Sequence, residues 1–351
     1  MSTQPVTLKD VAARAGVHPA TVSRALNPET RPLVSDETAD RILAVADSLG
    51  YRPNTVARSL RTRRSNSVGV LIPDLNNPLF PPIVRGIEDR LATDGYVALI
   101  GNTDSADERE RLVFESMRDR HVDGFVFATA RLHSEVLAEA AAARIPVVLV
   151  NRSAEGYGFP SVSVDNERGM TMAVAYLASL GHRKIAHIAG PQDISTGLSR
   201  YRGFIAAMTE HGLPVDESLI TYARVFSIDE GDRCCRELLE AGRDCTAIAA
   251  ANDMLAVGCY AALESAGLAC PADISVVGFN DMPFMDRLTP PLTSVSFPHY
   301  ELGRQAGRLV LEQIEDGPRN AEVHYLAPEL KVRGSAGPPA AVAAGLRGQA
   351  G

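Results

Sequence analysis

The chain has 351 residues, of which 45% are hydrophobic and 22% are charged, and its formal net charge is −8. These values are ordinary for a soluble globular protein with more than one domain. No run approaches the ~20 apolar residues of a membrane span, and the opening MSTQPVTLKD has no signal-peptide pattern, so we expect a cytoplasmic protein with no membrane partner. The five cysteines show no zinc-ligand spacing, so we expect reduced thiols and neither a metal nor a cofactor.

The first predicted element is a short helix that ends in a tight turn. Four apolar residues at the i, i+3, i+4, i+7 spacing predict it: Leu8, Val11, Ala12 and Ala15. Thr7 can cap this helix, with Asp10 three residues on in a capping-box arrangement. Gly16 can end it, because glycine tolerates the left-handed conformation that the turn needs.

A second and a third helix follow. The second begins at Pro19, where a missing N–H costs nothing, and should bury Val22 and Leu26. The third is predicted between its cap Ser35 and Gly50, and four apolar residues are expected to face inward: Ile42, Leu43, Ala46 and Leu49. Two helices joined by a glycine turn and supported by a third form an all-α helix-turn-helix domain, which we assign to residues 1–53.

Charge distinguishes two interpretations of these helices, a DNA-binding unit and a purely structural bundle. The segment Val6–Arg64 contains ten Lys/Arg and six Asp/Glu, which gives +4, so the rest of the chain carries −12. A basic head on an acidic body is typical of nucleic-acid binding, because attraction to phosphates supplies the sequence-independent part of the affinity. The charge therefore favours DNA binding.

Residues 54–67 read as a short helix followed by a basic, polar linker. Asn54 can cap a helix that runs to Leu60, but so short a helix is marginal in water and needs a partner surface. From residue 68 to 334 the pattern changes to short apolar strands alternating with helices, which predicts parallel sheets with helices on both faces. Two successive sets of these elements indicate two Rossmann-like lobes.

The last residues, 335–351, are rich in Ala, Gly and Pro and are predicted to form a disordered tail. They contain no leucine heptads, the pattern that a tetramer-forming tail would need. A homodimer is therefore the simpler expectation.

Polar side chains follow several of the predicted strands. In open α/β sheets, ligands bind beyond the C-terminal ends of the strands, so these residues are candidates for a ligand site. They supply carboxylate, amide and guanidinium groups, a mixture that suits polyol hydroxyls. The alternative for each is a turn or helix-cap role. The candidates are Asp74, Asn102, Asn151, Arg152, Asn252, Asn280 and Asp281.

The pieces TLKDVAARAGV and ATVSRALN, followed by GYRPNTVARSL, resemble the lactose/galactose repressor (LacI/GalR) family of bacterial transcription regulators. The resemblance extends to about Arg333. It implies a two-lobed periplasmic-binding-protein-like effector domain whose chain crosses three times between the lobes. The implied N-lobe is about 68–165 plus about 298–325, and the implied C-lobe is about 166–297 plus about 326–334.

The family resemblance also implies roles for individual residues. Arg200 in SRYRGF matches an effector-contacting arginine, Asn151, Asn252 and Asn280 match further contact positions, and Phe80 stands where some members stack an aromatic ring on the ligand. Several sugar-binding members carry Asp at the position of Asn280, so this chain lacks a charge there.

In the family, residues 54–60 form a hinge helix that orders on operator DNA and inserts a leucine into the minor groove. Leu60 holds that position here, and apolar wedges of this kind kink DNA. The alternative is that Leu60 packs on the body of the protein.

The second helix is expected to read bases with its first residues. Arg24 can take guanine O6 and N7 bidentately, and Ala20 can touch a thymine methyl. Pro19 offers no donor, and His18 is assigned to phosphate or base. Phosphate or capping contacts are assigned to the remaining candidates: Thr7, Thr21, Ser23 and Asn27, with Asn54 and Arg58 beside the hinge.

The leading hypothesis is an allosteric transcription regulator, most simply a repressor. A homodimer would bind a pseudo-palindromic operator, and a sugar or related metabolite between the lobes would change its affinity. A sugar-binding protein of a transport system is the alternative, which the basic head and the lack of a signal peptide oppose. An enzyme on a Rossmann-like sheet is a third hypothesis, but GxGxxG, GxxxxGK[ST], HExxH and GxSxG motifs are all missing, so we expect no enzyme.

Overall fold

A computed structural model of the chain describes residues 6–27, 30–52, 64–242, 244–317 and 321–340. The chain divides into two compact units, Met1–Ser65 and Asn66–Gly351. The predicted hinge helix, with Asn54, Arg58 and Leu60, lies outside the described residues, as does the tail from residue 341.

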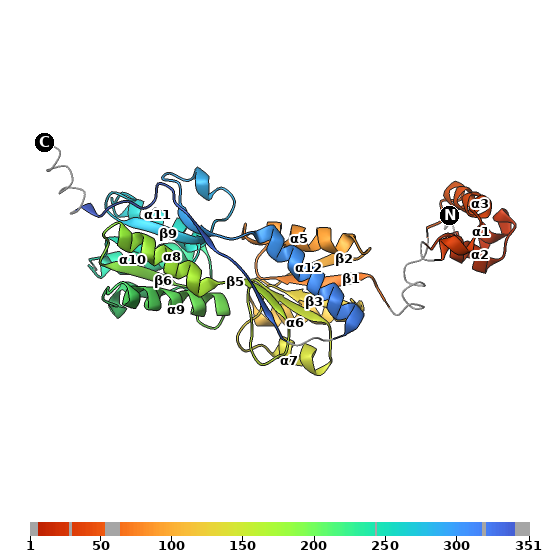
Figure 1. Cartoon of the computed structure of the whole chain (residues 1–351), viewed down its shortest axis with the longest axis horizontal. Coiled ribbons are helices and arrows are strands. Elements are labelled where there is room, and N and C mark those ends of the chain that lie inside the picture. Colours follow the sequence, from red (N-terminus) through yellow and green to blue (C-terminus); the bar gives the residue numbers. More distant parts are fainter. Residues whose placement is uncertain (1–5, 28–29, 53–63, 243, 318–320, 341–351) are drawn as a thin grey trace. The chain divides into compact units, whose positions relative to one another are not determined.

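The described residues of the first unit form three α-helices around a small apolar core (Figure 1). The helices are α1 (Leu8–Ala15), α2 (Pro19–Ala25) and α3 (Asp36–Ser48), with a short 3₁₀ turn at Arg31–Leu33. Val11, Val22 and Ile42 are fully buried where the three helices meet. The prediction that Leu43 faces inward is wrong, because its side chain is 46% exposed. Neighbouring helical residues point about 100° apart, so a unit this small buries Ile42 but not Leu43.

Within the described residues, the second unit contains two six-stranded sheets, one in each lobe (Figure 1). In the N-lobe the strand order is β11-β5-β4-β3-β1-β2, and every pairing is parallel. Strand β1, which lies between β3 and β2, places Val70 beside Ile100 of β2 and Val126 of β3. The strands of this sheet are β1 (Ser67–Ile72), β2 (Val97–Asn102), β3 (Gly124–Phe127), β4 (Val147–Val150), β5 (Ser161–Val164) and β11 (Val323–Leu326).

The C-lobe sheet has the order β12-β10-β9-β8-β6-β7. Its pairings are parallel except that β12 runs antiparallel to β10, which the prediction of parallel sheets did not foresee. Its strands are β6 (Ile185–Ala189), β7 (Ile220–Tyr222), β8 (Ala247–Ala250), β9 (Ser275–Asn280), β10 (Thr293–Ser296) and β12 (Glu329–Lys331).

Helices cover both faces of each sheet. In the N-lobe α5 packs against α12, and α6 contacts β1, β2 and α7. In the C-lobe α8 packs against α9, and α10 packs against α11. The helices are α5 (Phe80–Ala92), α6 (Asp107–Asp119), α7 (Glu135–Ala142), α8 (Asn166–Ser179), α9 (Ser195–Glu210), α10 (Ile228–Glu240), α11 (Asp253–Ser265) and α12 (His299–Asp316). With the helical first unit, this architecture confirms the predicted fold class.

The chain passes from one lobe to the other three times. It leaves the N-lobe sheet after β5, leaves the C-lobe sheet after β10 to form α12, and leaves the N-lobe sheet again after β11 to form β12. The two lobes are therefore joined by three connecting segments.

The contact between α5 and α12 depends on two glycines. A Cβ atom on Gly303 would lie 1.9 Å from the carbonyl oxygen of Ile83, and one on Gly86 would lie 2.1 Å from that of Tyr300. Both distances are far below a van der Waals contact, so the two helix backbones approach each other at positions that only glycine allows.

Packing continues past the predicted start of the tail. Ser335 is fully buried, donates from its hydroxyl to the Val276 carbonyl (2.6 Å) and accepts from the Thr293 N–H (2.8 Å). Its own carbonyl accepts from the Val276 N–H (2.8 Å). The prediction of disorder from residue 335 is therefore wrong at this position, because alanine- and glycine-rich composition does not report a serine that hydrogen-bonds to strands β9 and β10.

Candidate DNA-binding and effector-binding sites

The first helix of the amino-terminal unit has the predicted cap. The Asp10 carboxylate accepts hydrogen bonds from the N–H (2.8 Å) and hydroxyl (2.7 Å) of Thr7, and these bonds lower the pKa of Asp10. Gly16 ends α1 with φ of 66°. Thr7 therefore takes part in the cap of α1, one of the two roles assigned to it.

The second helix presents polar side chains away from the core. His18 caps α2: its Nδ1 accepts from the Ala20 N–H (3.2 Å), which in a neutral ring leaves the N–H on Nε2. Val22 and Ala25 are buried, whereas Ala20 and Arg24 are exposed. Among the described residues, no side chain forms an ion pair or hydrogen bond with the Arg24 guanidinium.

None of the DNA-binding candidates within the described residues is buried. Thr7, His18, Ala20 and Arg24 are exposed, and four are half-buried: Pro19, Thr21, Ser23 and Asn27. An exposed arginine on a helix whose other face holds the core can enter a DNA groove without unfolding.

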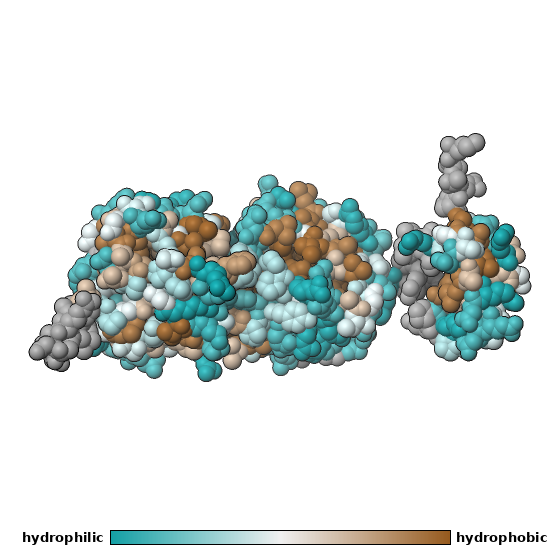
Figure 2. Space-filling view, turned by 90° about the horizontal axis from the view of Figure 1, so that it is seen from above, coloured by the Kyte–Doolittle hydropathy of each residue, from teal (hydrophilic) through white to brown (hydrophobic). Residues whose placement is uncertain are grey.

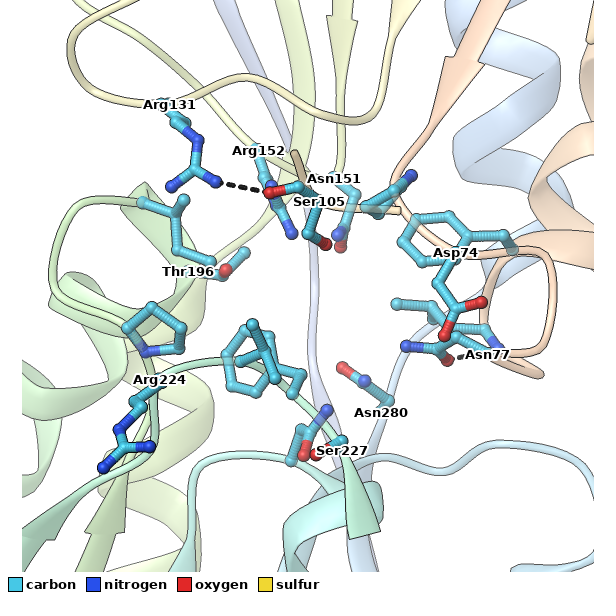
Figure 3. Close-up of a pocket in the computed structure, with 18 of the residues that line it drawn as sticks. Asp74, Asn77, Ser105, Arg131, Asn151, Arg152, Thr196, Arg224, Ser227 and Asn280 are labelled. Atoms are coloured by element: carbon cyan, nitrogen blue, oxygen red, sulfur yellow. Dashed lines mark hydrogen bonds between the residues drawn. The ribbon is translucent and has the colours of Figure 1, made fainter. Parts of the chain in front are cut away.

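A cleft of about 240 Å³ lies between the two lobes of the second unit (Figure 3). Its walls come from the loops that follow β1, β2, β3 and β4 in one lobe and β6, β7, β8 and β9 in the other. Seven of the nine predicted effector residues line it: Asp74, Phe80, Asn151, Arg152, Arg200, Asn252 and Asn280.

The other two predicted residues, Asn102 and Asp281, are not among those that line the cleft. Asn102 accepts from the Leu75 N–H (3.0 Å) and donates to the Asp104 carboxylate, so it shapes the adjacent loop. Asp281 forms an ion pair with Arg333 (2.7 Å). Both side chains follow a strand, but each bonds to a residue of its own lobe and not to the cleft.

Two of the asparagines in the cleft hold unusual backbone conformations. The φ angles of Asn151 and Asn280 are 65° and 114°. Asparagine adopts positive φ more readily than most residues, but 114° lies outside the left-handed helical region. Such a conformation persists only where the surroundings hold it.

Arg200 crosses the floor of the cleft and is 2% exposed. Its guanidinium donates to three acceptors: Asn166 Oδ1 (2.8 Å), the Ala251 carbonyl (2.7 Å) and Asn280 Oδ1 (3.1 Å). It also lies 3.8 Å from the centroid of the Phe279 ring, a cation–π contact. Burial lowers the pKa of Arg200 to about 9.

Three buried polar atoms on the cleft wall have no hydrogen-bond partner among the described residues. They are Asn151 Oδ1, Arg152 Nε and Thr196 Oγ1. Buried polar groups in folded proteins are nearly always hydrogen-bonded, so unsatisfied atoms along one cavity indicate a surface that a ligand completes.

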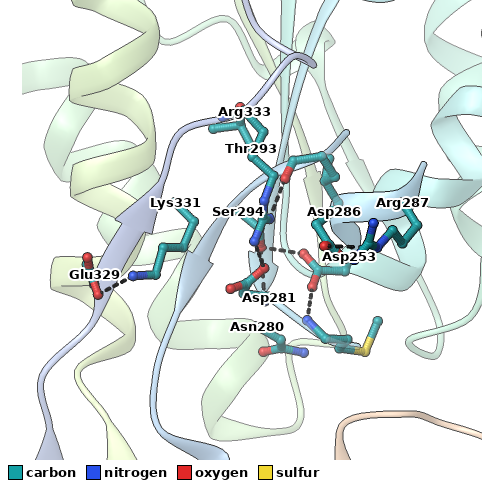
Figure 4. A network of polar contacts seen from close by, with 12 residues as sticks. Asp253, Asn280, Asp281, Asp286, Arg287, Thr293, Ser294, Glu329, Lys331 and Arg333 are labelled. Carbon is teal, nitrogen blue, oxygen red and sulfur yellow. Dashed lines mark hydrogen bonds and ion pairs between the residues drawn. The ribbon is translucent and has the colours of Figure 1, made fainter. Parts of the chain in front are cut away.

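A buried carboxylate supports the loop that carries Asn280 (Figure 4). Asp253 accepts from the Met282 N–H (2.8 Å) and from the Ser294 hydroxyl (2.5 Å), and that hydroxyl accepts from the Asp281 N–H (3.1 Å). Burial raises the pKa of Asp253 to about 7. This network fixes the backbone on the C-terminal side of Asn280.

The two lobes also contact each other directly beside the cleft. The Arg131 guanidinium pairs with the Asp193 carboxylate, and the Asp193 carbonyl accepts from the Leu132 N–H (2.9 Å). A second bridge runs from the Ser153 N–H to the Ser195 hydroxyl (2.8 Å). These bonds join loops of different lobes, so their formation depends on the angle between the lobes.

Sequence reasoning missed several lining residues, including Asn77, Arg131, Thr196, Arg224 and Phe226. Arg131 follows β3, and Arg224 and Phe226 follow β7. The strand-end rule that found Asn151 and Asn280 would have found these three had it been applied to those two strands.

Within the described residues, no helix is long and apolar enough to cross a membrane. No group of three or more His, Cys, Asp or Glu side chains in that part of the chain is arranged to hold a metal ion.

Comparison with known proteins gives matches over both units. The model for bacterial regulatory proteins of the lacI family matches residues 7–54, and that for the periplasmic binding protein-like domain matches residues 174–336. The chain is 35% identical to the ribose operon repressor of Halalkalibacterium halodurans, with 93% of this chain and 96% of that protein covered.

Two solved structures extend the likeness. One is a lac repressor dimer bound to operator and the anti-inducer ONPF, with a TM-score of 0.83, 26% identity, and coverage of 95% of this chain and 100% of that one. The other is a complex of the transcriptional regulator CelR with cellobiose, with a TM-score of 0.72, 31% identity, and coverage of 94% and 99%.

Proposed function

Because the chain belongs to the lacI family of bacterial regulatory proteins, it is a DNA-binding transcriptional regulator, and we propose that a small molecule in the inter-lobe cleft controls its repression of a target promoter. The observation that carries this proposal is the cleft itself. It gathers unsatisfied polar atoms from both lobes, so a ligand there bonds both at once.

The proposed mechanism is a shift in the angle between the lobes. A ligand that contacts Arg152 in one lobe and Arg200 in the other favours the arrangement in which both contacts form. It can shift the equilibrium only by the difference between its affinities for the two arrangements. We propose that the hinge and linker, residues 54–67, transmit this change to the helix-turn-helix unit.

We propose that the second helix of the amino-terminal unit reads operator bases. Arg24 is assigned to a base edge, and His18, with its Nδ1 used in the cap, is assigned a phosphate contact through Nε2. Thr21, Ser23 and Asn27 are assigned to phosphates. Asn54, Arg58 and Leu60 keep their assignment to the hinge and minor groove.

The effector is proposed to be a sugar or a related metabolite. Relatives named for the ribose operon and for a cellobiose complex support this class. The alternative of a transport protein without a DNA role is not favoured, because relatives that cover 93% and 95% of this chain are repressors. Since those relatives are named as repressors, we also propose that the chain has no catalytic activity of its own.

The working form is a homodimer on a pseudo-palindromic operator, in line with the lac repressor dimer. Exposed apolar side chains are available for association, and Figure 2 shows apolar patches on both lobes. The exposed apolar side chains of the second unit's described residues include Leu75, Val97, Ile100 and Tyr222. Its proposed place of action is the cytoplasm, where a bacterial chromosome lies.

The test is binding of the purified full-length protein to the DNA upstream of its own gene, with and without a panel of sugars and sugar derivatives. We expect specific binding whose affinity changes with one effector class. Arg200→Met, which keeps the length of the side chain but removes its donors, should bind DNA normally and lose the response by at least roughly tenfold, as expected for a charged hydrogen bond. A variant that responds like the wild type would remove Arg200 from the effector site.

A further inference from the structure

The cleft contains two buried guanidinium groups that no carboxylate neutralises. All three hydrogen bonds of Arg200 go to uncharged acceptors. Arg152 is 8% exposed, donates from Nη1 to the Thr129 carbonyl (3.1 Å), and has an Nε without a partner. Neither arginine forms an ion pair with any of the described residues.

Most of the hydrogen-bonding capacity of this pair is unused. A guanidinium has five N–H donors, of which Arg200 uses three and Arg152 uses one. Burial lowers the pKa of Arg152 to about 10, and repulsion from Arg152 adds to the effect of burial on the pKa of Arg200. The two cations therefore share one cavity and repel each other.

The acids around them do not supply the missing charge. Glu110 and Asp193 attract Arg152, but Asp193 is paired with Arg131, and burial raises the pKa of Glu110. The acid that attracts Arg200 is Asp253, whose oxygens already accept from Met282 and Ser294 and whose pKa is raised to about 7.

The same part of the cleft contains the N-terminus of α9, a helix of 16 residues. Its N-cap is Ile194, which has no side-chain acceptor, and the N–H groups of Ser195, Thr196 and Gly197 have no acceptor among the described residues. Thr196, in that turn, is 1% exposed and its hydroxyl has no partner. Free N–H groups and the helix dipole favour an anion at such a position.

The opposite wall offers hydrogen-bond acceptors instead. Asp74 and Asn77 lie across the cleft from Thr196 and Arg131 (Figure 3). Carboxylate and amide oxygens accept from hydroxyl groups, so this side suits the polyol part of a ligand.

We propose, resting on the assignment of the cleft as the effector site, that the effector is an anionic polyol whose carboxylate or phosphate lies between Arg152, Arg200 and the first turn of α9. A neutral sugar would bond the same donors but leave two cations buried without a counter-charge, which is costly. Sugar acids and sugar phosphates share the required chemistry, and the experiment below separates them.

The first test compares matched ligands by thermal denaturation and calorimetry of the full chain. D-Glucose is compared with D-gluconate and D-glucose 6-phosphate, and D-ribose with D-ribose 5-phosphate, at constant ionic strength. We expect the anionic member of a set to raise the Tm more and to bind at least tenfold more tightly than the neutral one. Preference for gluconate or for the phosphates identifies the anion. A neutral sugar that binds as tightly as its anionic counterpart would overturn the proposal.

The second test uses inorganic phosphate as the probe and needs no cognate sugar. Arg152→Gln removes one cation of the pair, and Arg202→Gln is the matched control, an exposed arginine on α9 outside the cleft. Phosphate should stabilise the wild type and Arg202→Gln, and at least half of this stabilisation should be lost in Arg152→Gln. Any phosphate bound by the basic amino-terminal unit acts equally on all three proteins. Equal stabilisation of all three would contradict an anion site at Arg152.

Folding of the variant is checked in the same experiment. Without ligand, Arg152→Gln should be at least as stable as the wild type, because it removes a buried charge that no carboxylate balances. If neutral sugars, and not anionic ones, release operator DNA, the anion assignment fails while ligand-responsive regulation stands. If no ligand of either kind changes operator affinity, the proposed function itself fails.

Discussion

At the scale of single residues, Asn280 links Arg200 in the cleft to the start of α12. Its side-chain oxygen accepts from Arg200, and its carbonyl accepts from His299 Nε2 (2.7 Å) at the start of α12. Its φ of 114° is unfavourable, and the hydrogen bonds of Asp253 to the following turn help to hold it. A substitution of Asp253 should therefore alter the position of Asn280 in the cleft, although Asp253 itself does not contact the ligand.

Asp253 predicts a particular pH dependence of stability. Its pKa is about 7 in the folded protein against an ordinary value of 3.8, so folding favours the protonated form. The resulting stabilisation is fully present below pH 4, is lost as the pH rises toward 7, and changes little above that. Asp253→Asn should lack this dependence, because its side chain does not titrate.

The measurement is the Tm of both proteins at pH 5, 6, 7 and 8 at constant ionic strength. The Tm of the wild type relative to Asp253→Asn should fall between pH 5 and 7. Other titrating groups, such as the buried His187, contribute to both curves and cancel in the difference. Parallel curves for the two proteins would show that Asp253 does not titrate in this range.

The positions of the site residues were partly predictable from sequence. The C-terminal ends of parallel strands converge, which is why Asp74, Asn151 and Asn280 could be assigned to one cleft. The same rule failed for Asn102 and Asp281, since a strand end does not tell whether a side chain turns to the ligand or to a neighbour such as Asp104 or Arg333. The hydrogen bonds by which Asp253 supports the turn after Asn280 could not be predicted, because they depend on tertiary packing alone.

At the scale of secondary-structure elements, the two faces of α2 have clearly different roles. Its buried face is closed by Val22 and Ala25, and Arg24 extends from the other side. Capping and apolar spacing are local properties, which is why both ends of α1 and the start of α2 were predicted close to where they are observed. Burial across the bundle is not local, and it is there that the prediction for Leu43 failed.

Arg24→Ala should weaken discrimination between operator and random DNA by about 1–3 kcal/mol, the usual value of one bidentate base contact. Fluorescence anisotropy with labelled duplexes at fixed salt measures this difference. Arg41→Ala, at an exposed position of α3, should change the two affinities alike. A variant at Arg24 that keeps full discrimination would rule out the base contact.

The pair α5 and α12 gives a second prediction at this scale. Gly303→Ala places a methyl group 1.9 Å from the Ile83 carbonyl oxygen, so the helices must separate. We expect the free energy of unfolding to fall by about 1–3 kcal/mol. This loss exceeds the gain in helix stability of about 1 kcal/mol that replacing glycine by alanine brings. Urea denaturation measures it.

Gly307→Ala on the same helix is the matched control. Its added methyl would approach the Arg90 Cβ at 3.1 Å, so a smaller shift relieves it. Equal losses of stability for the two variants would show that the close approach at Gly303 is not the cause.

At the scale of the whole molecule, bonds between the two lobes hold the second unit in its present arrangement. The Arg131–Asp193 pair is partly exposed, with 27% and 55% of its side chains accessible, so it adds little to the free energy of unfolding. Its effect is on the equilibrium between open and closed lobes, where a few tenths of a kcal/mol matter.

Asp193→Asn should therefore release effector faster while leaving the Tm nearly unchanged. Stopped-flow displacement of a bound ligand measures the rate. Asp244→Asn, which breaks the exposed Lys184–Asp244 pair within a single lobe, is the control and should leave the release rate unaltered. If both variants release ligand at the wild-type rate, the pair does not contribute to closure.

The three passages of the chain between the lobes limit how this protein can be dissected. Strand β11, at the edge of the first sheet, is encoded more than 150 residues after its neighbour β5, and the second sheet is likewise completed by β12 near the carboxyl end. No single cut in the gene yields one intact half. Truncation series will therefore report misfolding before they report lost activity, and point substitutions are the sound way to assign roles in this molecule.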